Sequence, residues 1–379
     1  DLNRLSFNSG ISHLRKLNLP LDASAKVVGP RLLHSSQYGI IDAIDTPDGG
    51  NIGLHKHLAI MAHMSTHINS EVFIEWLEKN MPFQYYEDEL PKYIDNSTKL
   101  FINGRWIGIV KSPFHYVEKF KQYRRIGCLP WSISIAFHVG HNKIEMFCDA
   151  GRLARPVFYT GMLMESVESQ YKVPIHYNSS EILSLTHNSS LFDLILKNEF
   201  SWEQILYGTL KTKIDRRINT LYNLDELFGE TRENIMEQLV LPSKYVQNSG
   251  IIDIIDSNEA ETSLMATYVE NYFDNLQEKL YTHVEIHPSI NFGVMGNQII
   301  YAENNPVTRN SFSCGQSKQA VSLYHSNFEN RFDKMGVMLN YGQVPLIKSR
   351  YLQHIQKEKH PYGENTIVAI MCYSGYNVE

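Results

Sequence analysis

Cysteine is scarce in this sequence of 379 residues. The four cysteines (Cys128, Cys148, Cys314 and Cys372) include no closely spaced pair. Structural zinc sites and disulfide frameworks both depend on closely or regularly spaced cysteines, so neither is predicted. Free thiols are typical of a reducing compartment. We therefore expect an intracellular protein and no zinc in this chain.

Long apolar runs and several common site motifs are also missing. Although 43% of the residues are hydrophobic, no run reaches eighteen apolar residues, which excludes a membrane-spanning helix. The patterns G-x-x-x-x-G-K-[ST], G-x-S-x-G and H-E-x-x-H do not occur, so the sequence predicts none of the sites that they encode. The apolar content is enough for two to four buried modules.

Neither end of the sequence looks like a natural terminus. The start, DLNRLSFNSG, lacks the basic and apolar regions of a signal peptide and runs straight into GISHLRKL, which is typical of the middle of an element. Near the other end, residues 367–373 are predicted to form a buried strand that is soon followed by a lone acid, Glu379. We expect an internal piece of a longer polypeptide.

Charge is unevenly distributed. The net charge of −6 argues against a protein that coats nucleic acid on every face. Residues 66–100 carry seven acids against three lysines, whereas residues 306–360 carry eight Lys/Arg against three acids, and residues 1–35 carry five bases against two acids. Basic ends around an acidic middle suit a molecule with one wall facing nucleic acid. Charge alone favours the simpler alternative of solvated helix faces.

The expected fold class is α+β (mixed α/β) with several modules. A helix is predicted over residues 5–17, and LFINGRWIGIV, with its NG turn, predicts a β-hairpin. IEMFCDAGRLARPVFY predicts strand, turn and strand, and GIIDIIDSNEAETSLMA predicts a strand followed by an acidic turn. Residues 181–270 look mostly helical. A later helix is predicted to begin at Asn310 or Ser311, either of which could be its N-cap.

Four histidines in LHKHLAIMAHMSTH form a candidate metal site. His55 and His57 would share one face of a strand, and His63 and His67 one face of a helix. No Cys or carboxylate stands at ligand spacing beside them, so packed or surface histidines are the favoured interpretation.

The stretch DAIDTPDGGNIGL brings Asp42, Asp45 and Asp48 close together in sequence. Neighbouring carboxylates could bind a divalent cation, and the glycines could cradle a phosphate, although no lysine follows them. The favoured interpretation is a structural turn in which Asp45 or Asp48 holds backbone N–H groups.

The segment PVTRNSFSCGQSKQA carries the clearest signal for phosphate binding. Arg309 stands just before the predicted helix start, where a guanidinium and free helix N–H groups suit a phosphate. Lys318 and Gln319, two to three turns into the helix, could hold a sugar-phosphate backbone by charge and by hydrogen bonds.

At these residues the sequence resembles a known family. RLSFNSGISHLRKLNLPLD and GPRLLHSSQYGIIDAIDTPDGGNIGL resemble the fork region of the second-largest, or beta-type, subunit of multisubunit DNA-directed RNA polymerases. FINGRWIGIV, IEMFCDAGRLARPVFY and GIIDIIDSNEAETSLMA look like its two external modules. THVEIHPS, NNPVTRNSFSCGQSKQA, LNYGQVPLI and GENTIVAIMCYSGYNVE look like the start of its hybrid-binding region. The matches follow the family order over nearly the whole chain.

The resemblance implies four regions. Residues 1–68 would be a fork-like region of helices and loops, residues 69–175 external module 1 and residues 176–280 external module 2, both small α/β modules. Residues 281–379 would start a β-rich hybrid-binding and active-centre region. This last region would be truncated at Glu379, because an Asp follows this acid in the family.

The implied function is that of a fragment of the second-largest catalytic subunit of DNA-directed RNA polymerase. This nucleotidyltransferase makes RNA from ribonucleoside triphosphates by two-metal chemistry. The largest subunit would hold most of the Mg²⁺ ligands, with Glu379 near the second Mg²⁺, and the isolated chain would be inactive. Arg309 would approach the nucleotide triphosphate, and Lys318 and Gln319 would face the RNA strand. The fork residues near the opening of the DNA would be Arg15, Lys16 and Arg31.

The implied partners are template DNA, nascent RNA and ribonucleoside triphosphates, with the largest and the smaller polymerase subunits, and no membrane. Departures from the family pattern concern the source: DAIDTPDGG keeps an acid at Asp48 but lacks the family's Cys-Pro, and Phe312 stands where Tyr is common. These departures suggest a divergent eukaryotic-type enzyme, with a large DNA virus as the first source considered. The location would then be a virus factory or virion in the host cytoplasm, and otherwise the nucleus.

Two other interpretations stay open at this point. A non-catalytic nucleic-acid-binding module could use the same scaffold, since the basic C-terminal stretch lacks a complete acid cluster. A metal hydrolase could be built on the histidine cluster. The ordered motifs favour the polymerase subunit.

Overall fold

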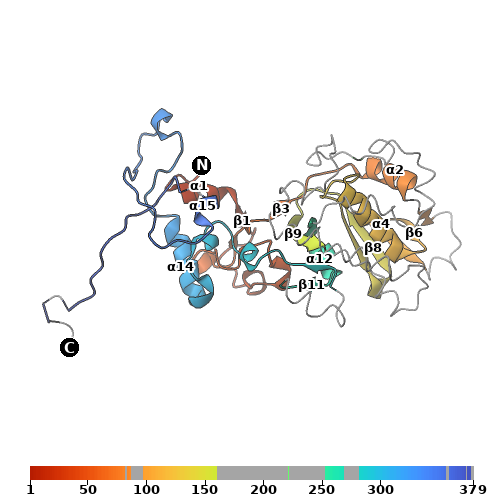
Figure 1. Cartoon of the computed structure of the whole chain (residues 1–379). Coiled ribbons are helices and arrows are strands. Elements are labelled where there is room, and N and C mark those ends of the chain that lie inside the picture. Colours follow the sequence, from red (N-terminus) through yellow and green to blue (C-terminus); the bar gives the residue numbers. More distant parts are fainter. Residues whose placement is uncertain are drawn as a thin grey trace, which may run out of the picture. The chain divides into compact units, whose positions relative to one another are not determined.

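The chain divides into two compact units. The computed structural model describes residues 1–81, 83–86, 97–159, 221, 252–268, 281–355, 358–372 and 374–376. Unit 1 consists of Asp1–Met61 and Ser289–Glu379, and unit 2 is Ala62–Pro288 (Figure 1). Short helices and small sheets give the expected α+β architecture. Within the described ranges, no helix is long and apolar enough to cross a membrane. The four-region division stays a prediction.

Unit 2 contains a five-stranded sheet. Its strands are β4 (Gln84–Tyr85), β5 (Thr98–Ile102), β6 (Arg105–Val110), β7 (Ser134–His138) and β8 (Lys143–Phe147). The order is β4-β6-β5-β8-β7, in which β5 and β8 are parallel and the other pairs are antiparallel. The predicted hairpin is confirmed: Asn103 and Gly104, between β5 and β6, have φ angles of 48° and 81°. A two-residue hairpin turn requires such left-handed values.

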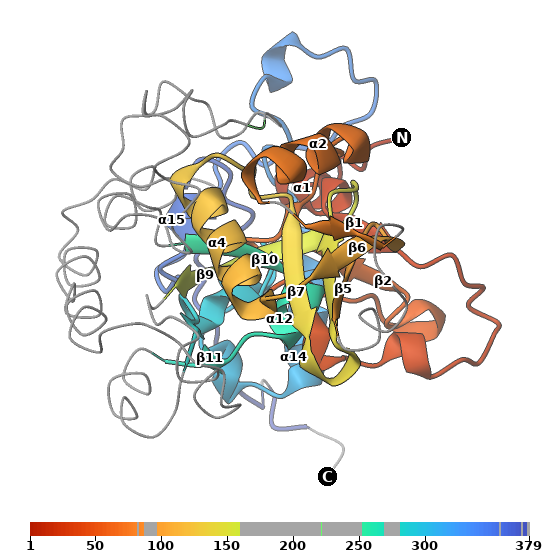
Figure 2. The ribbon, with the colours of Figure 1, turned by 90° about the vertical axis from the view of Figure 1, so that its right-hand side faces the viewer.

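Two helices pack against this sheet (Figure 2). Helix α2 (Ser70–Asn80) begins after Asn69, whose side chain accepts a hydrogen bond from the Glu71 N–H. Helix α4 (Pro113–Ile126) begins with proline and ends at Gly127, which has a left-handed backbone. The helices and strands share one core, whose fully buried side chains include Phe73, Leu77, Leu100, Phe120, Tyr123, Ile135, Ile144 and Met146.

A second sheet completes the described part of unit 2. Its strands are β3 (His63–Met64), β9 (Leu153–Tyr159), β10 (Ile252–Asp256), β11 (Met265–Ala266) and β12 (His283–Val284). The order is β10-β9-β12-β11, and β3 also pairs with β9. The predicted strand–turn–strand over β8 and β9 is therefore present, but its two strands belong to different sheets.

Two local predictions for unit 2 are wrong. The stretch after β10 is a short helix, α12 (Ser257–Glu261), rather than an acidic turn, because the Asp256 side chain accepts from the Glu259 N–H and caps it. His63 lies in strand β3 and not in a helix, because the backbone there pairs with β9. The predicted helical region at residues 181–270 lies mostly outside the described residues.

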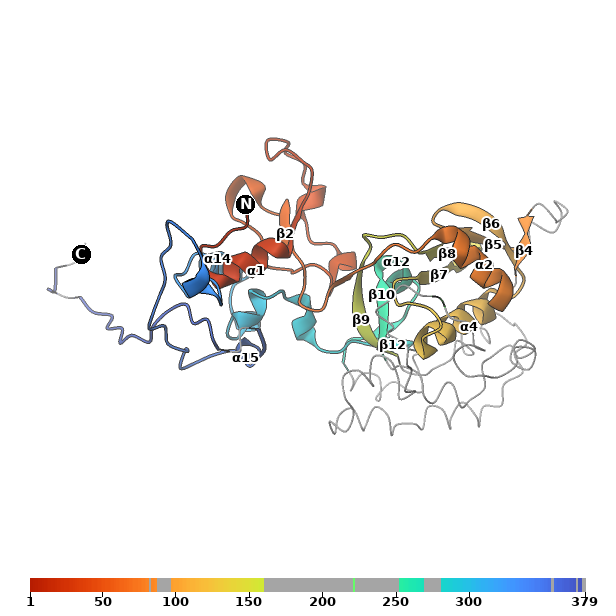
Figure 3. The ribbon, with the colours of Figure 1, turned by 90° about the horizontal axis from the view of Figure 1, so that it is seen from above.

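Two arginines at the end of α4 form ion pairs with acidic residues on β10 and α12. Figure 3 shows these three elements. Arg124 donates to both carboxylate oxygens of Glu259, at 2.9 and 2.7 Å, and Arg125 donates to Asp253 at 2.6 Å. Both carboxylates are at most 2% exposed. Burial alone would raise the pKa of Asp253, but the Arg125 guanidinium and a hydrogen bond from His283 hold it well below its usual value.

Unit 1 is assembled from short elements and loops. Helix α1 (Phe7–Leu14) begins with a reciprocal cap between Ser6 and Ser9. Strands β1 (Lys16–Asn18) and β2 (His55–His57) pair antiparallel. The later helices are α14 (Val307–Ser317) and α15 (Leu352–Ile355). The described 3₁₀-helices of the chain are η1 (Gly29–Arg31), η2 (Ser35–Gln37), η3 (Gly49–Asn51), η5 (Val139–His141), η6 (Pro288–Asn291), η7 (Gly296–Gln298), η8 (Ala302–Asn304) and η9 (Phe328–Asn330).

Several predictions for unit 1 differ from the structure. The first helix ends at Leu14, because residues 16–18 pair with β2. Helix α14 begins at Val307, after Pro306, and Asn310 does not cap it; its amide instead donates to the Ala302 carbonyl inside unit 1. No strand forms at residues 367–372, where Ile367 is fully exposed. In the described part of residues 281–379, β12 is the one strand, so the β-rich character is not observed there.

Replacing Arg124 by Ala should strongly destabilise unit 2. The change removes the bidentate partner of the buried Glu259 carboxylate and leaves it with the Lys121 ammonium, 3.4 Å from Oε1, so the cost should approach the about 3–5 kcal/mol of a broken buried pair without exceeding it. Because Trp76, Trp106 and Trp131 all lie in unit 2, urea unfolding followed by tryptophan fluorescence reports on this unit. Arg105→Ala is the matched control, since Arg105 is exposed and should change the free energy of unfolding by less than about 0.5 kcal/mol. Equal effects of the two changes would contradict the role given to the pair.

Candidate nucleic-acid interface

Arg309 lies in the first turn of α14 and points to solvent. The residue is exposed, and its guanidinium carbon lies 5.5 Å from the centre of the Phe312 ring. Within the described part of the chain, the guanidinium makes this cation–π contact and no hydrogen bond or ion pair. Its hydrogen-bond donors therefore remain open to a ligand. The first N–H groups of a helix lack partners within it and carry partial positive charge. Arg309 and the start of α14 therefore form a surface suited to a phosphate.

Lys318 forms the C-cap of the same helix and is held inside unit 1. Its ammonium donates to Asp45 Oδ1 at 2.5 Å and lies 3.3 Å from His57 Nε2. The Ser6 hydroxyl donates to the Lys318 carbonyl at 2.9 Å, which ties the end of α14 to the cap of α1. The Lys318 side chain is 20% exposed, whereas that of Asp45 is 4% exposed. Lys318 is therefore an ion-paired residue that still reaches the surface.

His57 lies between the acid and the lysine. Its Nδ1 is 3.0 Å from the backbone carbonyl of Asp45, which can only accept, so Nδ1 carries the proton and donates. Nε2 is then the acceptor for the Lys318 ammonium, and the ring is neutral. Burial lowers the pKa of His57, the charges of Lys318 and Lys16 lower it further, and the Asp45 carboxylate opposes them.

Asp42 connects this turn to a distant part of the chain. Its carboxylate accepts from the Ile44 N–H at 3.0 Å and from the Gly293 N–H at 2.6 Å. Burial raises the pKa of Asp42 to about 6, and these hydrogen bonds oppose the rise. Asp48, at the other end of the turn, accepts from the Gly49 N–H at 2.8 Å and caps η3.

The other predicted contacts differ in how far their side chains face solvent. Gln319 and Lys16 are exposed. Arg15 donates to the Ala59 carbonyl at 2.5 Å, and burial lowers its pKa. Arg31 donates to the carbonyls of Val27, Gly50, Ile52 and Ala23. Arg15 and Arg31 thus hold the loops around the site, whereas Lys16 and Gln319 present their polar groups to solvent. Glu379 lies outside the described residues.

The described residues do not provide a metal centre. Within them, no group of three or more His, Cys, Asp or Glu side chains could hold a metal ion. His55 and His57 belong to unit 1, whereas His63 and His67 belong to unit 2. Asp42, Asp45 and Asp48 bind backbone N–H groups or Lys318, as described above. A magnesium ion therefore finds no ligand set in the described part of the chain.

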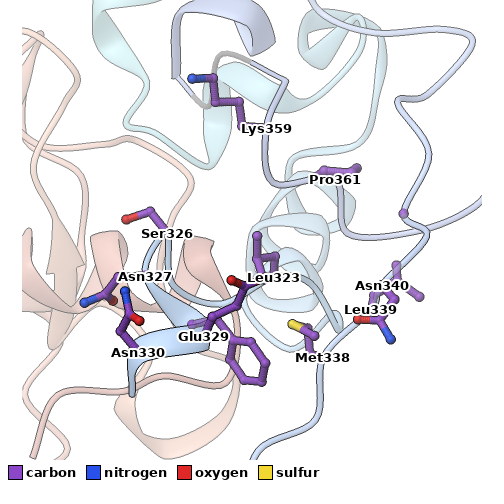
Figure 4. A pocket seen from close by; sticks show the side chains of 12 residues that line it. Leu323, Ser326, Asn327, Glu329, Asn330, Met338, Leu339, Asn340, Lys359 and Pro361 are labelled. Atoms are coloured by element: carbon purple, nitrogen blue, oxygen red, sulfur yellow. The ribbon is translucent and has the colours of Figure 1, made fainter.

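A separate surface pocket of about 500 Å³ lies in unit 1 (Figure 4). The side chains of Asn327, Asn330 and Lys359 stand around it, with apolar groups such as Leu323 and Met338. None of the predicted site residues lines it. Sequence analysis did not predict this pocket, because its residues come from loops and the short 3₁₀-helix η9 and show no recognisable spacing.

Three family models match successive parts of the chain. They are described as RNA polymerase Rpb2 domain 3, domain 4 and domain 6, and they match residues 2–64, 100–160 and 295–379. RNA polymerase II subunit RPB2 of Schizosaccharomyces pombe is 30% identical over 388 aligned residues, which cover the whole of this chain. The chain belongs to the Rpb2 family, the second-largest subunits of RNA polymerases.

Other members of the Rpb2 family align over the whole chain too. RNA polymerase II subunit 2 of Arabidopsis thaliana is 29% identical, and RNA polymerase subunit Rpo2 of Sulfolobus acidocaldarius is 27% identical. The chain spans 27% to 30% of the length of these three relatives. Arg309 and Lys318 lie within the segment that matches domain 6, and Asp45 and His57 within the segment that matches domain 3. The roles predicted for Arg309, Lys318 and Asp45 stay predictions; sequence analysis considered His57 only as a metal ligand, because only the fold brings it to Lys318.

Asp42 should titrate near pH 6. Its folded-state pKa is about 6, above the ordinary value of 3.8, so the folded state binds a proton between these values while the unfolded state does not. Asp42 should therefore lower the stability of unit 1 as the pH rises from about 4 to above 6. Carboxyl ¹³C NMR, with assignment by Asp42→Asn, measures the midpoint. Asp22 is the internal control, since hydrogen bonds from Ser24 lower its pKa. A midpoint for Asp42 at or below that of Asp22 would contradict the effect of burial.

Proposed function

We propose that this chain forms part of the active centre of a DNA-directed RNA polymerase, the activity named for its relatives. RNA would be made from ribonucleoside triphosphates on a DNA template, with the largest and smaller subunits as partners. Transcription in the nucleus or its cellular equivalent agrees with relatives from a yeast, a plant and an archaeon. A viral source stays a prediction that these relatives do not support.

The observation that carries this proposal is the exposed Arg309 at the start of α14. The guanidinium is free of acidic partners among the described residues, stands beside helix N–H groups, and lies in the segment that matches Rpb2 domain 6. A planar guanidinium can bind two phosphate oxygens at once. We assign Arg309 to the triphosphate of the incoming nucleotide, where negative charge concentrates as pyrophosphate leaves.

The remaining residues would support the nucleic acid. Lys318 and Gln319, at the other end of α14, would hold the RNA backbone, and Lys16 would face the fork in the DNA. Arg15 and Arg31 would keep the fork loops in shape through the carbonyls that they bind. Magnesium, when bound, would supply charge neutralisation at the phosphates, held mainly by the largest subunit with Glu379 nearby. This chain's own residues bind and orient the substrate.

Replacing Arg309 by Ala in the assembled polymerase should lower the rate of nucleotide addition by about 10²-fold. Loss of one preorganised charge donor has this effect when it acts mainly on the transition state. Arg309→Lys should restore only part of the rate, because a point charge cannot copy the planar fork. Single-turnover addition at saturating nucleotide is the measurement.

Arg350→Ala is the matched control. Arg350 is also exposed in unit 1 and also lies over an aromatic ring, that of Tyr351 at 5.8 Å. The control removes the same charge and the same type of contact, so its rate should stay near that of the wild type. A near wild-type rate for folded Arg309→Ala would show that Arg309 is structural, and equal losses in both variants would point to a general effect of charge.

A further inference from the structure

The ammonium of Lys318 is already hydrogen-bonded within unit 1. Two of its three protons are directed to Asp45 Oδ1 and His57 Nε2, at 2.5 and 3.3 Å. The side chain is 20% exposed, which leaves one face open to solvent. A phosphate that approaches from this side would compete with Asp45 for the ammonium.

Removing Lys318 from Asp45 would be costly unless another cation replaced it. The Asp45 side chain is only 4% exposed, and a buried carboxylate without a partner strongly destabilises the fold. His57 Nδ1 is 3.4 Å from Asp45 Oδ1 and 3.0 Å from the Asp45 carbonyl, so the ring already lies against this residue. A protonated His57 would supply the missing positive charge without moving.

The charged groups that act on His57 come from three parts of unit 1. Lys16 stands across from it on β1, Asp45 lies in the turn, and Lys318 lies at the end of α14. Asp42 lies close to Asp45 and adds negative charge to the turn above its pKa of about 6. With Lys318 in place, burial and the two lysines hold the pKa of His57 low. When Lys318 leaves, its repulsion disappears, and the Asp45 carboxylate then raises the pKa of the ring against burial and Lys16 alone.

We propose that Asp45 and His57 are positioning residues that exchange Lys318 with a nucleic-acid phosphate, and that His57 takes up one proton in the exchange. In the free state the ammonium is paired with Asp45, and His57 is neutral. In the bound state the ammonium contacts the phosphate, and the imidazolium of His57 pairs with Asp45. The proton comes from solvent. The Asp45 carboxylate therefore has one cationic partner in both states. This inference rests on the proposed function, since it needs a nucleic acid at Lys318.

The exchange links affinity to pH. The bound state holds one more proton than the free state, so binding must tighten as the pH falls. In the pH range between the pKa of His57 in the free state and its pKa in the bound state, each unit by which the pH falls should lower the dissociation constant by up to about tenfold. If His57 served in packing alone, replacing it by Gln would leave the pH slope unchanged.

The test uses an RNA–DNA hybrid oligonucleotide with a fluorescent label and the purified chain. Anisotropy titrations from pH 5.5 to 8.5 should show the pH slope for the wild type. His57→Gln should lose it, because an amide keeps hydrogen bonds to Asp45 and Lys318 but does not titrate in this range. His55→Gln is the matched control on the same strand and should keep the slope, since His55 contacts Asn18 rather than Lys318.

Two further measurements separate the possible outcomes. Calorimetry in buffers of different ionisation enthalpy measures the number of protons taken up on binding. The wild type should take up nearly one proton more than the His57→Gln variant. Lys318→Gln should reduce the salt slope of binding by about one. Binding of the hybrid by the wild type without proton uptake would overturn the inference and leave the proposed function standing. Failure of the wild type to bind the hybrid at any pH would overturn both.

Discussion

The turn at residues 42–48 is the constraint on which unit 1 depends. Asp42 accepts from Gly293, 251 residues away in sequence, and Asp45 pairs with Lys318, 273 residues away. The space is tight: a Cβ on Gly293 would stand 2.8 Å from the Asp42 carboxylate, and one on Gly296 3.1 Å from it. Carboxylates placed in so little volume must be satisfied by backbone N–H groups or by a cation. The position of α14, and with it Arg309, follows from these contacts.

Unit 2 also contains buried carboxylates, and there arginines neutralise them. Two adjacent arginines on α4 cancel two buried carboxylates on β10 and α12, and the Arg125 guanidinium also stacks 3.3 Å from the centre of the Tyr159 ring. Buried ion pairs add little net stability compared with apolar packing, but breaking one is costly. Such pairs favour one arrangement of α4 against the second sheet over the alternatives that apolar contacts alone would allow.

Local chemistry explains which parts of the fold the sequence could predict. The NG hairpin and strand β10 follow from turn residues and apolar runs, and the structure contains both. The start of α14 was misplaced because Asn310 looks like a cap, whereas the fold uses its amide to hold Ala302. His63 was assigned to a helix because spacing cannot reveal pairing with β9. The link between His57 and Lys318 depends on residues 261 apart, which no local pattern encodes.

The two units also differ in the order in which their chain becomes available during synthesis. Unit 2 is continuous, whereas unit 1 is completed only when Ser289 and the residues after it join Asp1–Met61. Domains generally fold as units as the chain leaves the ribosome, and closing a loop costs less entropy when its interior is already compact. Unit 2 can therefore fold first and bring the two halves of unit 1 closer together. Until residues 289–379 have been synthesised, Asp42 lacks the Gly293 N–H and Asp45 lacks the Lys318 ammonium as a partner. Residues 1–61 therefore cannot complete unit 1 before that point.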